Sequence, residues 1–106
     1  MSDTAFSRFL FQHRVARNWS MSEMARRSGL SQPEISRIES GRRLPTIRHV
    51  KGAAEAFSAS PIEGANEPKY YADWLVRFVD VAERTREAAR VGPGRWAKRK
   101  PVTPDE

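Results

Sequence analysis

The chain has 106 residues and a net charge of +6, with 39% hydrophobic and 30% charged residues. This composition is typical of a globular protein with one domain and an extension. The absence of cysteine excludes disulfides and thiolate metal sites. The start lacks a secretory-signal pattern, and no stretch approaches the roughly 18 apolar residues of a membrane span, so we expect a cytoplasmic, nucleoid-associated protein.

The positive charge is unevenly distributed along the chain. Residues 1–57 carry a net charge of +5, residues 58–91 carry −1, and residues 92–106 carry +2. An excess at the beginning and the end indicates a surface that binds a polyanion, next to a nearly neutral second module.

Two amphipathic helices are predicted first. Apolar residues recur at helical spacing between residues 4 and 17. The second helix runs from Met21 to Ser28. Ser20 is its expected N-cap, and Gly29 can end it because glycine adopts the left-handed conformation at little cost.

The third helix, from Gln32 to about Ser40, has the clearest start signal. Ser31 and Glu34 form an S-x-x-E capping box, and Pro33 lies in the first turn, where its missing N–H costs little. Ile35 and Ile38 point inward. The sequence therefore predicts two short helices joined by a tight turn.

Two further helices complete the prediction. Thr46 is the expected N-cap of a helix that continues to about Phe57. Residues 58–69 contain two prolines and a glycine, and are a linker or an ordered loop. A long helix follows over 70–91, and G-P-G at 92–94 ends it.

The segment from about residue 10 to 57 resembles the helix-turn-helix domain of the Cro and phage-repressor type, the XRE family. The matching marks are Arg14, S-x-x-E-M-A at 20–25, G-L-S-Q at 29–32, I-S-R-I-E-S-G at 35–41 and P-T-I at 45–47. The resemblance implies an all-α, four- to five-helix lambda-repressor-like fold, with a buried pair between Arg14 and Glu39. It also implies that the third helix lies in the major groove and that dimers read two half-sites about one DNA turn apart.

The outward face of the third helix is the predicted base-reading surface. With the two isoleucines inward, a step of about 100° per residue leaves the polar residues outside. Gln32 can pair with adenine and Arg37 with guanine, whereas Pro33 offers only an apolar contact. The predicted base-reading residues are Ser31, Gln32, Pro33, Ser36 and Arg37.

A second set of residues is predicted to contact phosphates. Arg42 and Arg43 follow the third helix, and the starts of the second and fourth helices offer backbone N–H groups. Many relatives carry glutamine where this chain has Met21, so only the backbone contact transfers. The set comprises Ser20, Met21, Ser40, Arg42, Arg43 and Ile47.

Other polar residues are given structural roles. Glu34 is assigned to the capping box rather than to reading cytosine. His13 is expected to be half-buried and His49 to lie on the surface. With two histidines and no cysteine, we expect neither a metal site nor a cofactor.

The helix over 70–91 carries more large apolar side chains than a small four-helix core can hold. We interpret it as a dimerisation helix; the alternative is a fifth helix that covers the domain of a monomer. The predicted interface residues are Tyr71, Trp74, Leu75, Phe78 and Val81. The tail is either a solubilising end or a contact to a nucleic-acid backbone, with Trp96 stacking on a base or docking on the partner.

These features divide the chain into a helix-turn-helix domain (1–57), a linker (58–69), a dimerisation helix (70–91) and a basic, flexible tail (92–106). We predict a sequence-specific regulator of transcription, a homodimeric repressor or autorepressor on a palindromic operator in double-stranded DNA. The alternatives are an antitoxin-type module that neutralises a protein partner, and an RNA-binding regulator. Small proteins of this kind are common in mobile genetic elements. No catalytic constellation is present, so neither an enzyme nor a small-molecule ligand is expected.

Overall fold

The structure is a computed structural model that describes residues 3–91. This part of the chain consists of helices joined by loops, and it contains no strand. The helices are α1 (Ala5–Ala16), α2 (Met21–Ser28), α3 (Gln32–Glu39), α4 (Ile47–Ser58) and α5 (Tyr71–Val91). The predicted all-α fold is confirmed. No helix in the described part is long and apolar enough to cross a membrane.

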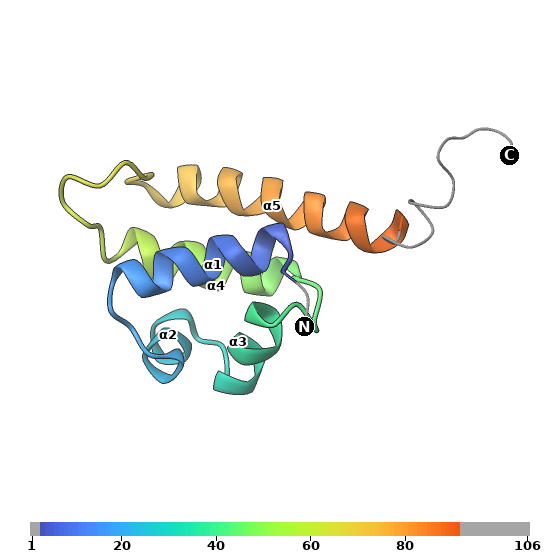
Figure 1. Cartoon of the computed structure of the whole chain (residues 1–106). Coiled ribbons are helices and arrows are strands. Elements are labelled where there is room, and N and C mark those ends of the chain that lie inside the picture. The colour runs from blue at the N-terminus through green and yellow to red at the C-terminus, as the bar shows by residue number, and fades with distance from the viewer. Residues whose placement is uncertain (1–2, 92–106) are drawn as a thin grey trace, which may run out of the picture.

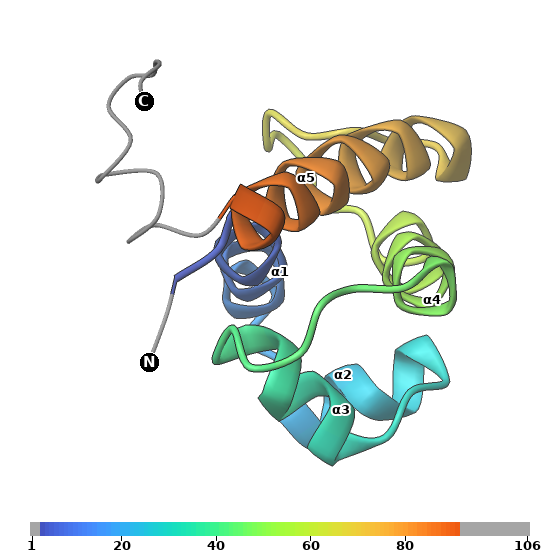
Figure 2. The same ribbon diagram turned by 90° about the vertical axis from the view of Figure 1, so that its right-hand side faces the viewer.

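The helices form a layered arrangement. The helix α5 lies across α1 and α4, and α2 and α3 lie on the other side of that pair (Figures 1 and 2). The short helix α3 is therefore on the face of the molecule opposite to α5. Nothing in the described layers covers its outer side.

The helix ends follow the local signals in the sequence. The hydroxyl of Ser20 accepts a hydrogen bond from the N–H of Glu23 at 3.1 Å, as expected for an N-cap. Ser31 and Glu34 bond to each other's backbone N–H groups, both at 3.2 Å. Gly29 ends α2 with φ of 75°, in the left-handed region that favours glycine. These contacts fix the turn between α2 and α3.

Aromatic side chains from α1, α4 and α5 fill the core. The ring of Phe78 lies 5.5 Å from that of Phe6 and 5.0 Å from that of Phe9, and Phe57 lies 5.2 Å from Trp74. The inward faces of α1 and α4 therefore meet the inward face of α5 ring against ring, in one continuous core.

This packing corrects the predicted dimer interface. Trp74 and Phe78 are fully buried, and Val81 is 8% exposed, within a single chain. They cannot serve as the surface that a second subunit contacts. The rings of Phe6 and Phe9 from α1 and of Phe57 from α4 contact the rings of Trp74 and Phe78, so these side chains complete the core of one chain. Of the predicted set, Leu75 is half-buried and Tyr71 is 40% exposed.

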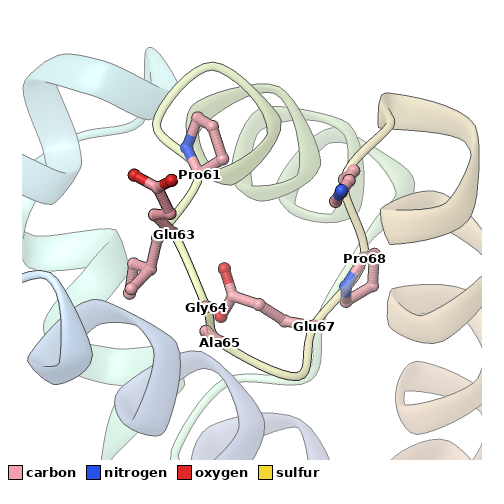
Figure 3. A pocket seen from close by; sticks show the side chains of 8 residues that line it. Pro61, Glu63, Gly64, Ala65, Glu67 and Pro68 are labelled. Carbon is pink, nitrogen blue, oxygen red and sulfur yellow. The ribbon is translucent and has the colours of Figure 1, made fainter.

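The linker between α4 and α5 is an ordered loop that hydrogen bonds hold against the end of α1. Its Glu67 carboxylate accepts hydrogen bonds from Arg17 at 2.5 Å and contacts Nδ1 of His13 at 3.0 Å. Arg17 also donates to the carbonyl of Ser60 at 2.9 Å. The side chains of Arg17 and Glu67 are almost completely buried. The loop forms a hollow lined by its own residues 61–65 and 67–69 (Figure 3).

Candidate nucleic-acid interface

An ion pair joins α1 to the end of α3. Nε and Nη2 of Arg14 donate to the two carboxylate oxygens of Glu39, at 2.7 and 2.9 Å. Nη1 of Arg14 donates to the carbonyl of Trp19 at 2.7 Å, just before α2. The guanidinium thus holds α1, α3 and the α1–α2 connection together. This is the pair that the resemblance implies.

The exposed side of α3 and its N-cap carries the five residues that the sequence predicts to read bases. Ile35 and Ile38 are buried, with exposures of 0% and 1%, and they anchor the helix on the core. The opposite side is exposed and consists of Ser31, Gln32, Pro33, Ser36 and Arg37. The structure therefore brings all five predicted base-reading residues to one accessible surface.

Glu34 is fully engaged within the protein. One carboxylate oxygen accepts from the N–H of Ser31, and the other accepts from Nη1 of Arg48 at 2.7 Å. The hydrogen bond from Arg48, reinforced by that from Ser31, lowers the pKa of Glu34. The carboxylate of Glu34 therefore has a structural role in this surface.

Sequence reasoning missed the part played by Arg48. This residue lies in the first turn of α4 and is 14 positions away from Glu34. No local spacing rule connects two residues on different helices at that distance. Its guanidinium braces the start of α3 against the start of α4.

Three arginines on this side have no carboxylate partner in the described part of the chain. Arg37 lies on α3, and Arg42 and Arg43 lie in the loop after it; all three are exposed. By contrast, Arg26 and Arg27 of α2 both bind Glu23. Unpaired guanidinium groups next to α3 give that surface its positive charge.

The loop that carries two of these arginines is held against the end of α3. The backbone N–H groups of Arg42 and Arg43 both donate to the carbonyl of Arg37, at 2.9 and 3.2 Å. Gly41 makes the turn possible with φ of 79°. These hydrogen bonds therefore hold the backbone of Arg37, Arg42 and Arg43 in a fixed arrangement.

The remaining predicted phosphate contacts lie at helix ends. Ser20 is exposed, Met21 is half-buried against the core, and Ile47 is 59% exposed. The first N–H groups of any helix have no partner within that helix, so the starts of α2 and α4 offer donors. Ser40 is half-buried, and its hydroxyl donates to the carbonyl of Arg37 at 3.1 Å. Its side chain serves the end of α3.

His49 was expected on the surface, and this expectation is wrong. The side chain is buried, and its Nδ1 accepts a hydrogen bond from the N–H of Thr46 at 3.0 Å. Histidine thus caps the start of α4 much as Glu34 caps α3. Burial lowers the pKa of His49. His13 is half-buried as expected, and burial lowers its pKa against the opposing effect of Glu67.

The described residues contain no group of three side chains that could hold a metal ion. The expectations for the basic tail and Trp96 concern residues outside the described part of the chain.

A family model described as helix-turn-helix matches residues 10–63, half of the chain. This range runs from the middle of α1 into the loop after α4 and includes the whole exposed surface of α3. Searches of curated proteins and of solved structures returned no match.

Proposed function

Because the chain belongs to the helix-turn-helix family of the XRE type and is a DNA-binding transcription regulator, we propose that it is a homodimeric repressor. It would occupy a palindromic operator that overlaps a promoter. The family is a regulatory one and is typically not enzymatic. The observation that carries the proposal is the unpaired Arg37 on the outward face of α3, between two buried isoleucines.

In this proposal, α3 enters the major groove and reads base edges. A guanidinium can donate two hydrogen bonds to O6 and N7 of guanine, and such a pair contributes roughly 1–3 kcal/mol of discrimination. Arg37 is free to make this contact. Ser31 and Ser36 add short donors, and Pro33 adds an apolar surface for a thymine methyl group.

Phosphates on both sides of the groove would fix the register of the helix. Arg42 and Arg43 approach one strand from the loop after α3. The first backbone N–H groups of α2 and α4, at Met21 and Ile47, supply uncharged donors. These contacts strengthen binding to any sequence and make it depend on salt.

A repressor that reads two half-sites needs a dimer whose recognition helices face one duplex. The helix α5, which carries the exposed residues Val76 and Val79, lies on the side of the molecule opposite to α3 (Figure 1). Two copies paired through these two residues would point their α3 helices away from each other. That geometry argues against them as the dimer contact.

A better surface lies between the α3–α4 loop and the last turns of α5. Leu44, 46% exposed, lines a hollow there. The other lining residues alternate in charge: Glu83, Arg86, Glu87 and Arg90. A surface that carries both signs can pair with its own copy across a two-fold axis. We therefore propose this hollow as the dimer contact, with residues 1–57 as the DNA-reading part.

The function is tested by selecting bound sequences from random duplex DNA with the purified protein. We expect enrichment of one palindrome whose half-sites are about one helical turn apart. Leu44→Glu should lower the molar mass measured by analytical ultracentrifugation to that of a monomer, and it should weaken operator binding. The matched variant Val76→Glu should leave both unchanged. Recovery of no enriched sequence would refute the proposed function.

A further inference from the structure

A hydrogen bond from α5 holds the loop between α3 and α4. Nη1 of Arg86 donates to the carbonyl of Pro45 at 3.0 Å, across 41 positions of the chain. Arg86 lies in the second half of α5, and Pro45 is buried shortly before the start of α4. The loop is therefore joined to a helix that lies outside the segment matched by the family, residues 10–63.

This bond adds a third point of attachment to a loop that is already held at both ends. At its beginning, two backbone N–H groups of the loop donate to the carbonyl of Arg37. At its end, the N–H of Thr46 donates to Nδ1 of His49. The bond from Arg86 to Pro45 lies in the stretch between these two ends, so α3, α4 and α5 each hold one part of the loop.

The conformation of this loop matters because it carries two of the exposed arginines next to α3. Arg42 and Arg43 directly precede the stretch that Arg86 holds. A loop that samples many conformations loses this freedom when its side chains bind phosphates, and the loss costs conformational entropy. An attachment that already exists in the unbound protein lowers this cost.

We infer that Arg86 is a positioning residue for DNA binding: it holds the α3–α4 loop in the conformation from which Arg42 and Arg43 contact phosphates. The inference rests on these two phosphate contacts of the proposed function. Since α5 lies on the side of the molecule opposite to α3 (Figure 1), Arg86 acts through the loop. The helix α5 thus contributes to DNA binding without contacting DNA.

Arg86 also lines the hollow that we propose as the dimer contact. Loss of its side chain could therefore weaken DNA binding by a second route, through the dimer. The two routes differ in how they combine with a loss in the loop. If Arg86 acts through the loop, Arg43→Ala costs less once Arg86 is replaced. If Arg86 acts through the dimer alone, the two losses are independent and their effects multiply.

The test is a double-mutant cycle of the wild type, Arg86→Met, Arg43→Ala and the double variant, titrated with duplex DNA at several salt concentrations. Arg43→Ala should weaken binding roughly 10-fold in the wild type, as expected for one charge-assisted hydrogen bond, and less than about 3-fold when residue 86 is methionine. Arg86→Met alone should reduce the slope of log K against log salt by about 1 to 2. An equal effect of Arg43→Ala in both backgrounds would overturn the inference.

Two variants of α5 control for charge and for the donor. Arg84 binds Asp80 at 2.6 Å, and it points away from Arg86 because two residues of a helix span about 200°. Arg84→Met removes the same charge from the same helix and should leave the salt slope unchanged. Arg86→Lys keeps a cationic donor and should restore most of the affinity. Equal losses for Arg84→Met and Arg86→Met would show that net charge alone is responsible, against the inference.

The cycle is run on the selected palindrome and on an unrelated duplex, because phosphate contacts form with any sequence. If no palindrome is enriched but the unrelated duplex shows the expected coupling, the proposed repressor is wrong and the role of Arg86 holds. If a palindrome is enriched and the effects of the two substitutions multiply, only the role of Arg86 is wrong. Absence of binding to either duplex would overturn both.

Discussion

The hydroxyl oxygen of Thr85 accepts a hydrogen bond from the backbone N–H of Phe6 at 2.9 Å, across 79 positions of the chain. The same hydroxyl donates to the carbonyl of Val81 at 2.7 Å. Thr85 is 3% exposed. The first turn of α1 has no helical partner for this N–H, so a side chain from α5 satisfies it. The end of the described chain is therefore tied to its beginning.

Thr85→Val should destabilise the fold by about 1–3 kcal/mol, because it keeps the shape of the side chain and leaves a buried N–H without an acceptor. Urea unfolding followed by circular dichroism measures the effect. Thr85→Ser retains the hydroxyl and is the matched control. Equal stability of the valine variant and the wild type would contradict the assigned role.

Trp74→Ala should lower the free energy of unfolding by about 3–5 kcal/mol, as expected for a large side chain in a core. This loss should not depend on protein concentration, because the contacts of Trp74 are within one chain. Val76→Ala, on the exposed side of the same helix, should stay within about 0.5 kcal/mol of the wild type. A concentration-dependent loss for Trp74→Ala would point back to a subunit interface.

Gly52→Ala should destabilise the protein although it places a better helix former in α4. A Cβ atom at this position would lie 2.6 Å from the carbonyl oxygen of Ser28. Overpacking typically costs about 1–3 kcal/mol, more than the roughly 1 kcal/mol that alanine contributes as a helix former. Thermal unfolding, with Lys51→Ala as an exposed control on the same helix, gives the sign. A rise in melting temperature would mean that α2 and α4 are not in close contact.

Local signals made most of the fold predictable. The capping box at Ser31 and the glycine after α2 lie within a few residues of the structure they determine, so they could be identified from the sequence. The core role of Trp74 could not, because it depends on how far apart α1 and α4 lie. Periodicity identifies an apolar face without identifying what covers it.

Arg37→Ala should abolish preference for the operator while the fold remains intact. Arg43→Ala should instead weaken binding to all sequences similarly and reduce the salt dependence, because one phosphate contact is lost. Titrations of operator and unrelated duplexes at several salt concentrations distinguish the two. Unchanged operator affinity of Arg37→Ala at fixed salt would show that α3 does not read bases through this residue.

The protein should lose stability as the pH falls below about 6.5, the value for a histidine in the unfolded chain. Burial lowers the pKa of His13 and His49, so the folded state binds fewer protons than the unfolded state. The free energy of unfolding therefore falls on acidification. For His49, the nearby Glu34 opposes this shift, and Arg43 and Arg48 add to it.

His49→Gln provides the control for this pH dependence. Glutamine at the third position of a helix can accept the N–H of the N-cap residue, here Thr46, without titrating. Denaturation at a series of pH values should give a shallower decline for this variant than for the wild type. An identical pH profile would exclude His49 as a contributor.

The candidate site was predictable in part, for the same reason as the fold. The outward face of α3 follows from the positions of Ile35 and Ile38 alone. The contacts of Glu34 with Arg48 and of Gln32 with Ser22 join different helices. They depend on the angle between those helices, which no spacing in the sequence encodes.

The aromatic packing of α5 on α1 and α4 determines how much of the chain a fusion protein must include. A fragment cut after residue 63 would retain the whole segment that matches the family, yet it would expose the rings of Phe6 and Phe57 to water. The segment needed for the chain to fold is therefore longer than the segment that matches the family. A fusion or miniature should carry residues 3–91 as a single piece.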